Sequence, residues 1–329
     1  MKIDIKDLKK KLQSLKFAMK KSDIDGYGSH IYVTDRMIYT FNGYIKIACP
    51  FDYDMEFAVP ADDFIKFISK STKGEIEIEL QEDNLFMKSG STTLLIVNNK
   101  KLIRGIIDLP LTPTEFKRLP SRFIDGLKMC VKTYSNNDLL NNPNIFVKDD
   151  VIASTDSMRV SEYIFDESFD REFLIPGKIA KEIIKYNMEY YSMEDQIIHF
   201  SSSDDIVFSV VQKNDNFPNY KRLFNILDGF EFTFPDTFKA VVDKIKGLSD
   251  GELYVTVGNG LIKCVIEGDG SKIEDECICD SENDFGMKVN SRNLSEALEI
   301  TTEVSIDLKH TAILFEDDHY AQIITVWEI

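Results

Sequence analysis

Hydrophobic positions along the chain predict a unit of strand, helix and further strands that occurs three times. An extended apolar run leads into an amphipathic helix pattern in FAVPADDFIKFIS from Phe57, FLIPGKIAKEIIK from Phe173 and MKVNSRNLSEALE from Met287. With Val59, Ile175 and Val289 as equivalent anchors, the successive spacings are 116 and 114 residues. A constant period of this size indicates repeated structural units.

The helical segments share one amphipathic plan. Six of them can be recognised, over residues 6–21, 60–73, 120–134, 176–187, 235–247 and 291–301. In the first, Leu8, Leu12, Leu15 and Met19 fall on one stripe at helical spacing, with lysines off it. Between the helices, alternating runs such as EIEIEL from Glu75 predict half-buried strands. The expected fold class is therefore α+β. Each third of the chain is predicted to contain a helix, several strands, a second helix and further strands.

Turn signals and a second set of matches divide the chain into three modules. IYVTDRMIYTFN from Ile31 aligns with IFVKDDVIASTD from Ile145 at an offset of 114 residues, and more loosely with LYVTVGNGLIKC from Leu253. The proline- and threonine-rich stretch 108–113 and the stretch 223–229 suit boundaries. We expect modules at 1–110, 111–226 and 227–329, which abut without flexible linkers.

Charge is distributed unevenly between the predicted elements. The chain has 39 Lys and Arg against 56 Asp and Glu, a net charge of −17, which alone argues against a nucleic-acid partner. The six helical segments, however, hold 20 of the basic residues and 9 of the acidic ones, so the helices are basic and the rest is acidic. Lysine faces on ordinary surface helices are common. Their recurrence in repeated modules favours a shared surface that contacts phosphates without reading bases.

The candidate DNA-facing residues are lysines on these helices. They are Lys9, Lys16, Lys20, Lys66, Lys70, Lys73, Lys128, Lys132, Lys178, Lys181, Lys185, Lys239 and Lys246. Because the remaining surface is acidic, DNA would be repelled everywhere else, and the contact would be salt-sensitive and mobile.

Signatures of catalysis, metal binding and membrane insertion are absent from the sequence. His30, His199, His310 and His319 show no metal-ligand spacing, and no GxGxxG, GxxxxGK[ST] or GxSxG motif occurs. The five cysteines form no CxxC pair, which is typical of reduced thiols in a cytosolic chain. The charged N-terminal residues and the lack of a long apolar run argue against a signal peptide or a membrane span. We expect a cytoplasmic protein that is not an enzyme and needs no cofactor or metal.

Four motifs carry a resemblance to a known family. IASTDSMRVSEY from Ile152, FLIPGKIAKEI from Phe173, NFPNYKRLF from Asn216 and VNSRNLSEAL from Val289 occur in this order. They resemble the ATDGHRLA signature, the helix start of the second module, the FPDYRR motif and the third-module FNxxYLxxAL pattern of the β sliding clamp of bacterial DNA polymerase III. Order and spacing agree over nearly the whole chain. The chain is shorter than typical bacterial members and divergent, which would suit a phage-encoded clamp in the host cytoplasm.

The resemblance implies a head-to-tail homodimeric ring with helices around a hole for double-stranded DNA and sheets outside. An ATP-driven clamp loader would place the ring on DNA, where it would tether a DNA polymerase for processive replication at the nucleoid. A trimeric clamp of archaeal or eukaryotic type is disfavoured because its chains carry two modules. The alternative from another class is an acidic peptide-binding scaffold that does not encircle DNA. A hydrolase is disfavoured because no nucleophile or metal cluster is apparent.

The resemblance also implies a hydrophobic pocket between the second and third modules, which receives short peptides of polymerase and loader. By motif, with Leu140 a looser match and the C-terminal residues placed by position, its wall would be Leu140, Thr155, Ser157, Met158, Arg159, Val160, Pro218, Arg222, Leu223, Ile323, Thr325, Val326 and Trp327. Ser157 and Met158 stand where the family has Gly and His, so the preferred peptide would differ. Two alternatives stay open: Arg159 pairs with an acidic neighbour, and Trp327 packs in the core.

A subunit contact follows from the same resemblance. It would join an edge strand of the first module to the third module of a second copy, and an apolar edge strand needs covering. The candidate residues are Leu94, Ile96, Val242, Ile245 and Leu248.

Overall fold

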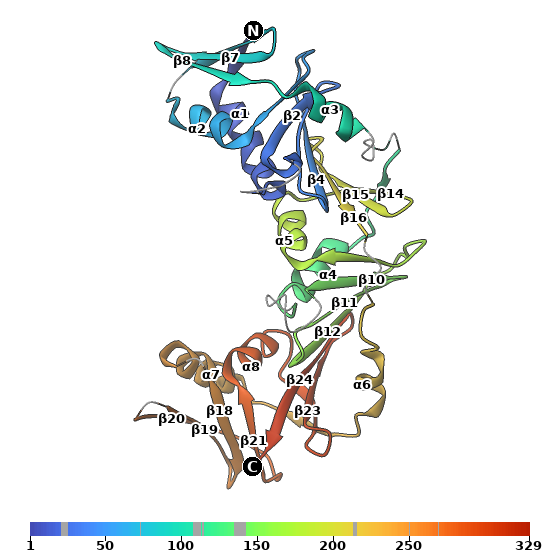
Figure 1. The fold of residues 1–329 in the computed structure, drawn as a ribbon. Coiled ribbons are helices and arrows are strands. Elements are labelled where there is room, and N and C mark those ends of the chain that lie inside the picture. Colours follow the sequence, from blue (N-terminus) through green and yellow to red (C-terminus); the bar gives the residue numbers. More distant parts are fainter. Residues whose placement is uncertain are drawn as a thin grey trace. The chain divides into compact units, whose positions relative to one another are not determined.

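The chain forms two compact units of helices and antiparallel sheets (Figure 1). The computed structural model describes residues 1–20, 26–72, 74–107, 113, 115–134, 143–212, 216–249, 251–268 and 270–329. The first unit comprises Met1–Leu119 and Lys185–Asn214, and the second comprises Pro120–Ile184 and Asp215–Ile329. This architecture confirms the predicted α+β class. The module boundaries at 110 and 226 stay a prediction.

The first unit contains two sheets, of strand order β1-β6-β7-β8 and β5-β2-β3-β4-β16-β15-β14-β9. Its strands are β1 (Lys2–Asp4), β2 (His30–Thr34), β3 (Met37–Phe41), β4 (Ile45–Pro50), β5 (Phe57–Pro60), β6 (Glu75–Gln81), β7 (Asn84–Ser89), β8 (Thr92–Val97), β9 (Lys117–Arg118), β14 (Tyr190–Glu194), β15 (Ile197–Ser201) and β16 (Val207–Val211). Its helices are α1 (Ile5–Leu15), α2 (Ala61–Lys70) and α3 (Lys100–Ile107), with short 3-10 helices η1 (Lys16–Ala18) and η2 (Tyr27–Ser29). Strand β16, from the second third of the sequence, pairs with β4 from the first.

The second unit is built on one sheet of twelve strands, in the order β13-β10-β11-β12-β24-β21-β18-β19-β20, with β23, β22 and β17 continuing from β24. Its strands are β10 (Asn144–Lys148), β11 (Val151–Thr155), β12 (Arg159–Ile164), β13 (Phe173–Pro176), β17 (Phe230–Thr233), β18 (Glu252–Gly258), β19 (Leu261–Gly268), β20 (Ser271–Ile278), β21 (Phe285–Asn290), β22 (Glu303–Asp307), β23 (Ala312–Glu316) and β24 (Tyr320–Glu328). Its helices are α4 (Phe123–Cys130), α5 (Gly177–Lys185), α6 (Lys221–Ile226), α7 (Asp236–Leu248) and α8 (Ser291–Ala297).

The predicted repeat is confirmed by strand register. In each copy the anchor residue lies on the strand that leads into a helix, opposite an apolar residue of the first strand of a hairpin. The three pairs are Ile31 with Val59, Ile145 with Ile175, and Leu253 with Val289. All six side chains are fully buried. Because strand register decides which face each residue occupies, the three copies share one internal geometry.

Helix α1 shows where local signals set the boundaries. The Asp4 carboxylate accepts hydrogen bonds from the backbone N–H groups of Lys6 and Asp7, which caps the N-terminus. The stripe residues Leu8, Leu12 and Leu15 are buried. The α-helix ends at Leu15, earlier than the predicted residue 21, and Met19 lies in extended backbone beyond η1, only half-buried.

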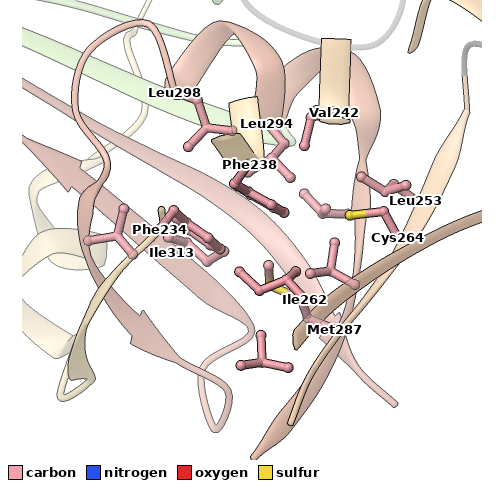
Figure 2. Packing of buried hydrophobic residues seen from close by; sticks show 14 of the residues in the cluster. Phe234, Phe238, Val242, Leu253, Ile262, Cys264, Met287, Leu294, Leu298 and Ile313 are labelled. Atoms are coloured by element: carbon pink, nitrogen blue, oxygen red, sulfur yellow. The ribbon is translucent and has the colours of Figure 1, made fainter. Parts of the chain in front are cut away.

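The third repeat has a well-packed core between its two helices and the sheet (Figure 2). Phe238 and Val242 of α7 and Leu294 of α8 point onto the strands that carry Ile262 and Met287. Burying side chains of this size contributes about 1.5–3 kcal/mol each. The apolar side of α7 therefore faces the core.

Two short helices escaped sequence-based prediction. Helix α6 buries none of its residues, so it has no apolar stripe of the usual kind. Helix α3 spans eight residues and begins at Lys100, soon after strand β8 ends at Val97. Among the described residues, no helix is long and apolar enough to cross a membrane.

Candidate functional site

The turn between β11 and β12 forms one corner of the predicted peptide pocket. Its geometry is fixed by Asp156, whose Oδ1 accepts hydrogen bonds from the backbone N–H groups of Met158 and Arg159. The hydroxyl of Thr155 donates to the carbonyl of Arg159 at 2.7 Å. Ser157 takes a left-handed conformation with φ 76°. The turn therefore holds the Met158 side chain outward, 36% exposed.

Strand alternation separates the two faces of the sheet at this corner. Ser154 donates to the carbonyl of Cys130 at the end of α4, so the face that carries Ser154 is the helix side. Thr155 and Val160 are directly opposite each other and lie on the other face, which we call the groove face. Val160 in turn lies opposite Ile323 of β24, and the backbone N–H of Thr325 donates to the carbonyl of Met158 at 2.9 Å. Four predicted pocket residues, Thr155, Val160, Ile323 and Thr325, thus share the groove face.

The segment 216–226 packs on the groove face. Its Phe217 ring stacks on Phe146 with ring centroids 5.1 Å apart, and its Tyr220 ring packs against Ala153 and Val160. The three predicted residues of this segment, Pro218, Arg222 and Leu223, are exposed beside that contact. Leu223 is 42% exposed. Among the predicted residues, the segment therefore presents the apolar Leu223 and the cationic Arg222 next to the sheet.

Arg159 does not belong to the groove face. Its side chain alternates with Val160, is 7% exposed, and points to the helix side. There Nε donates to Asp156 Oδ2 at 2.9 Å, Nη1 to Glu296 Oε2 at 2.5 Å and Nη2 to the carbonyl of Lys132 at 2.8 Å. The structure thus bears out the alternative in which Arg159 pairs with acidic neighbours. We therefore remove Arg159 from the predicted pocket wall.

The C-terminal strand β24 divides its residues in the same way. Val326 is fully buried among the core residues of the third repeat, so it too is removed from the pocket wall. Trp327 is 37% exposed and lies opposite Lys288, whose ammonium nitrogen is 5.6 Å from the centre of the indole ring. Core packing of Trp327 is thus not observed. Leu140 lies outside the described residues.

A large cavity was not anticipated from the sequence. Its volume is about 1070 Å³, and it lies in the second unit around the turn between β23 and β24. Its lining includes none of the described pocket candidates. Six carboxylates line it, from Asp125, Glu231, Glu303, Glu316, Asp317 and Asp318. This cavity could not be predicted from the sequence, because Asp125, Glu231 and Glu303 come from segments far from the acidic run 316–318.

Comparison with known proteins gives matches at the level of structure alone. No family model and no curated protein sequence matches the chain. The Helicobacter pylori β clamp bound to a DNA ligase peptide superimposes with a TM-score of 0.80 at 17% identity, over 100% of this chain and 99% of that chain. The DNA polymerase III subunit beta from Pseudomonas aeruginosa gives 0.80 at 15% identity over 100% of both chains. A putative DNA polymerase III beta subunit from Eubacterium rectale gives 0.79 at 13%, over 100% and 98%.

The chain has the β sliding clamp fold. The match runs from end to end, and it accounts for the three-fold repeat of register. At these identities the likeness shows the fold and leaves the roles of individual residues to the geometry.

In this clamp fold the predicted lysine faces keep most of their charge accessible. Nine lysines are exposed: Lys16, Lys20, Lys66, Lys70, Lys128, Lys132, Lys178, Lys181 and Lys185. Lys9 and Lys246 are half-buried and link neighbouring helices, since Lys9 donates to the carbonyls of Ser69 and Ser71, and Lys246 to Ser295. Lys239 is also half-buried and pairs with Asp243 of its own helix. Lys73 lies outside the described residues. The first nine are therefore the better candidates for contact with phosphates.

In the described part of the clamp fold, two of the strands at sheet edges, β8 and β20, expose large apolar side chains. Strand β8 pairs with β7 and exposes Leu95 (57%) and Val97 (64%), whereas Ile96 is buried and Leu94 half-buried. Of the two predicted residues, Ile96 is therefore not accessible to another chain and Leu94 is accessible only in part, because alternation alone does not tell inside from outside. The subunit contact itself stays a prediction. Strand β20 pairs with β19 and exposes Ile278 (78%).

Helix α7 runs beside β20 and forms a shallow groove with it. The groove has a volume of about 410 Å³, and its lining includes Val241, Cys277 and Ile278. Val242 and Ile245 are fully buried in the core, so neither can contact another chain, which corrects that part of the prediction. Leu248, at the end of the same helix, is 66% exposed and stays a candidate.

Proposed function

We propose that this protein is a sliding clamp, which encircles double-stranded DNA as a head-to-tail homodimer and tethers a DNA polymerase for processive replication. The observation that carries the proposal is the end-to-end match to bacterial β clamps, with TM-scores up to 0.80. The exposed lysines of repeated helices support it, because a ring needs a cationic lining in an otherwise acidic protein. The clamp would act without chemistry of its own, in the cytoplasm at the nucleoid.

The topology of DNA tests encirclement. With its clamp loader and ATP, the protein should stay on nicked circular DNA and slide off linear DNA. Equal retention on both would favour the acidic scaffold. Replacing Lys178, Lys181 and Lys185 by Glu should abolish retention, whereas Lys148→Glu, an exposed lysine on a strand, should not.

We infer that the ring closes between β8 of one copy and the α7–β20 groove of the next. Leu95 and Val97 are exposed on a free edge, and the groove offers apolar area beside a second free edge. Such an interface is heterologous and closes a ring of two only if each contact contributes a half turn.

Light scattering tests this closure. The wild type should have twice the chain mass of 37.8 kDa, and a threefold mass would support the trimeric alternative. Leu95→Asp with Val97→Asp should give the monomer. Ile164→Asp, which places a charge on another exposed apolar side chain in the second unit, should leave the dimer intact.

For partner binding, we propose that the groove face receives short hydrophobic peptides of polymerase and loader. The support is that Met158, Leu223 and Trp327 are each partly exposed, that Val160 and Ile323 lie opposite each other on the groove face, and that a DNA ligase peptide is bound to the Helicobacter pylori clamp. Met158→Ala or Arg222→Ala should weaken binding of the C-terminal peptide of the polymerase from the same genome while the dimer stays assembled. Unchanged affinity in both variants would reject the site.

A further inference from the structure

Beneath the segment 216–226, one buried carboxylate on the groove face has no counterpart in the predicted pocket wall. Glu162 of β12 is 7% exposed. Its Oε2 accepts a hydrogen bond from the Tyr220 hydroxyl at 2.6 Å, and it forms an ion pair with Lys221 Nζ at 2.6 Å. An ionised carboxylate in such a place is costly unless donors compensate it, and both donors come from the same segment.

The sheet leaves room for this contact. Glu162 lies opposite Ala153 of β11 on one side and opposite Ala321 of β24 on the other. Two alanines beside a long side chain form a slot, and the Tyr220 ring packs against Ala153 there. Phe217 and Phe224 meet the Tyr220 ring edge-on, with centroids 5.7 Å and 6.2 Å away. The ring therefore enters the slot with its hydroxyl directed at the carboxylate.

We propose that Glu162 is a positioning residue for the peptide site: through Tyr220 and Lys221 it fixes where Pro218, Arg222 and Leu223 stand. The aromatic contacts keep the segment 216–226 on the groove face but allow it to shift along the sheet. The short hydrogen bond from Tyr220 to the Glu162 carboxylate fixes its position at one point. Arg222 and Leu223 follow Lys221 directly on α6, so their placement depends on that point. The proposal rests on the proposed peptide-binding function of the groove face.

Three variants separate the parts of this arrangement. Tyr220→Phe keeps the ring and removes the donor, Glu162→Ala removes the acceptor, and Glu162→Gln keeps an acceptor oxygen without the charge. We expect Tyr220→Phe and Glu162→Ala to weaken binding of the polymerase C-terminal peptide by about tenfold. Glu162→Gln should retain part of the peptide affinity that Glu162→Ala loses. The double variant Tyr220→Phe with Glu162→Ala should bind no worse than Glu162→Ala, because Glu162→Ala already removes the hydrogen bond that Tyr220→Phe removes.

The matched control is Tyr320→Phe. Its hydroxyl is also buried and bonded to the same strand, 2.7 Å from Ser161 Oγ, but on the helix side. Peptide affinity should be unchanged in this variant. A loss equal to that of Tyr220→Phe would show a general loss of stability and overturn the positioning role.

Amide hydrogen exchange gives a readout that needs no peptide. Exchange at residues 221–226 should accelerate in Tyr220→Phe and in Glu162→Ala, and stay at the wild-type rate in Tyr320→Phe. Unchanged exchange in the first two variants would overturn the proposal by itself. If exchange accelerates as expected but the wild type binds no peptide, the positioning stands and the proposed peptide function fails.

Discussion

Arg159 and Glu296, 137 positions apart in the sequence, form an ion pair in which Nη1 lies 2.5 Å from Oε2. The same guanidinium holds Asp156 in its own turn and the carbonyl of Lys132 beyond α4. Lys132 adds a second link through Glu299, which lies just beyond the end of α8, at 2.9 Å. These contacts fasten the second repeat to the third inside one unit.

Removing the Arg159 side chain should therefore destabilise the second unit. Arg159→Ala leaves Glu296 and Asp156 without their cation, and we expect a cost of about 3 kcal/mol. Urea unfolding followed by the fluorescence of Trp327, the single tryptophan and a residue of this unit, measures it. The exposed pair Lys128–Asp125 provides the control, since Asp125→Asn should cost less than about 1 kcal/mol. Equal losses of unfolding free energy in Arg159→Ala and Asp125→Asn would contradict the stabilising role of Arg159.

Acid should weaken the first unit through His199. Burial of this fully enclosed ring, helped by the positive charge of Lys46, lowers its pKa to about 4 from 6.5. Its Nδ1 is 2.8 Å from Ser209 Oγ, and Nε2 has no partner among the described residues. Since the unfolded chain takes up the proton first, stability should fall as the pH drops from about 6.5 towards 4, by up to about 3 kcal/mol.

The variant His199→Asn isolates that effect. It should be less stable than the wild type at pH 8, because it leaves a cavity, yet its stability should change less between pH 6.5 and 4. Calorimetry at several pH values measures both. A wild-type slope retained in His199→Asn would assign the pH dependence to other groups.

Asp307 should act at lower pH in the second unit. Burial of this carboxyl would raise its pKa, but hydrogen bonds from the backbone N–H of Asp228 and from His310 outweigh that effect and lower the pKa to about 2. A depressed pKa stabilises the fold above the unfolded value of 3.8, and that stabilisation is lost as the pH falls towards 2. Asp307→Asn should flatten the fall in Trp327-monitored stability between pH 4 and 2, and an unaltered profile would contradict this assignment.

Ser157 stands in a conformation that suits glycine better. Its φ of 76° is unfavourable for a residue with a Cβ. Ser157→Gly should therefore stabilise the second unit by up to about 1 kcal/mol, less the entropy that glycine gains in the unfolded chain. Ser157→Val should destabilise it, because a branched side chain fits this region worst. Melting temperatures of the two variants that moved in the same direction would show that the backbone angle is not the cause.

How far the sequence predicts this structure depends on the range of the contacts. The anchors Val59, Ile175 and Val289 and most of the buried stripe of α1 were predicted because period and alternation are local signals. Arg159 was misplaced because its partner Glu296 comes from another repeat. The exposed face of β8 was missed because alternation gives two equivalent choices until the opposite layer is known. Most of the groove face followed from motif resemblance, whereas Glu162 and its slot depend on β12 lying between β11 and β24.

The pairing of β16 with β4 has a consequence for truncated fragments of this protein. Residues 207–210 of β16 pair with residues 45–48 of β4, so a fragment that ends near residue 110 would keep β3 and β4 but lose β16. Strand β4 would then expose unpaired backbone N–H and C=O groups, which can pair with other molecules and lead to aggregation. The period of the sequence and the smallest piece able to fold alone are therefore different lengths of chain.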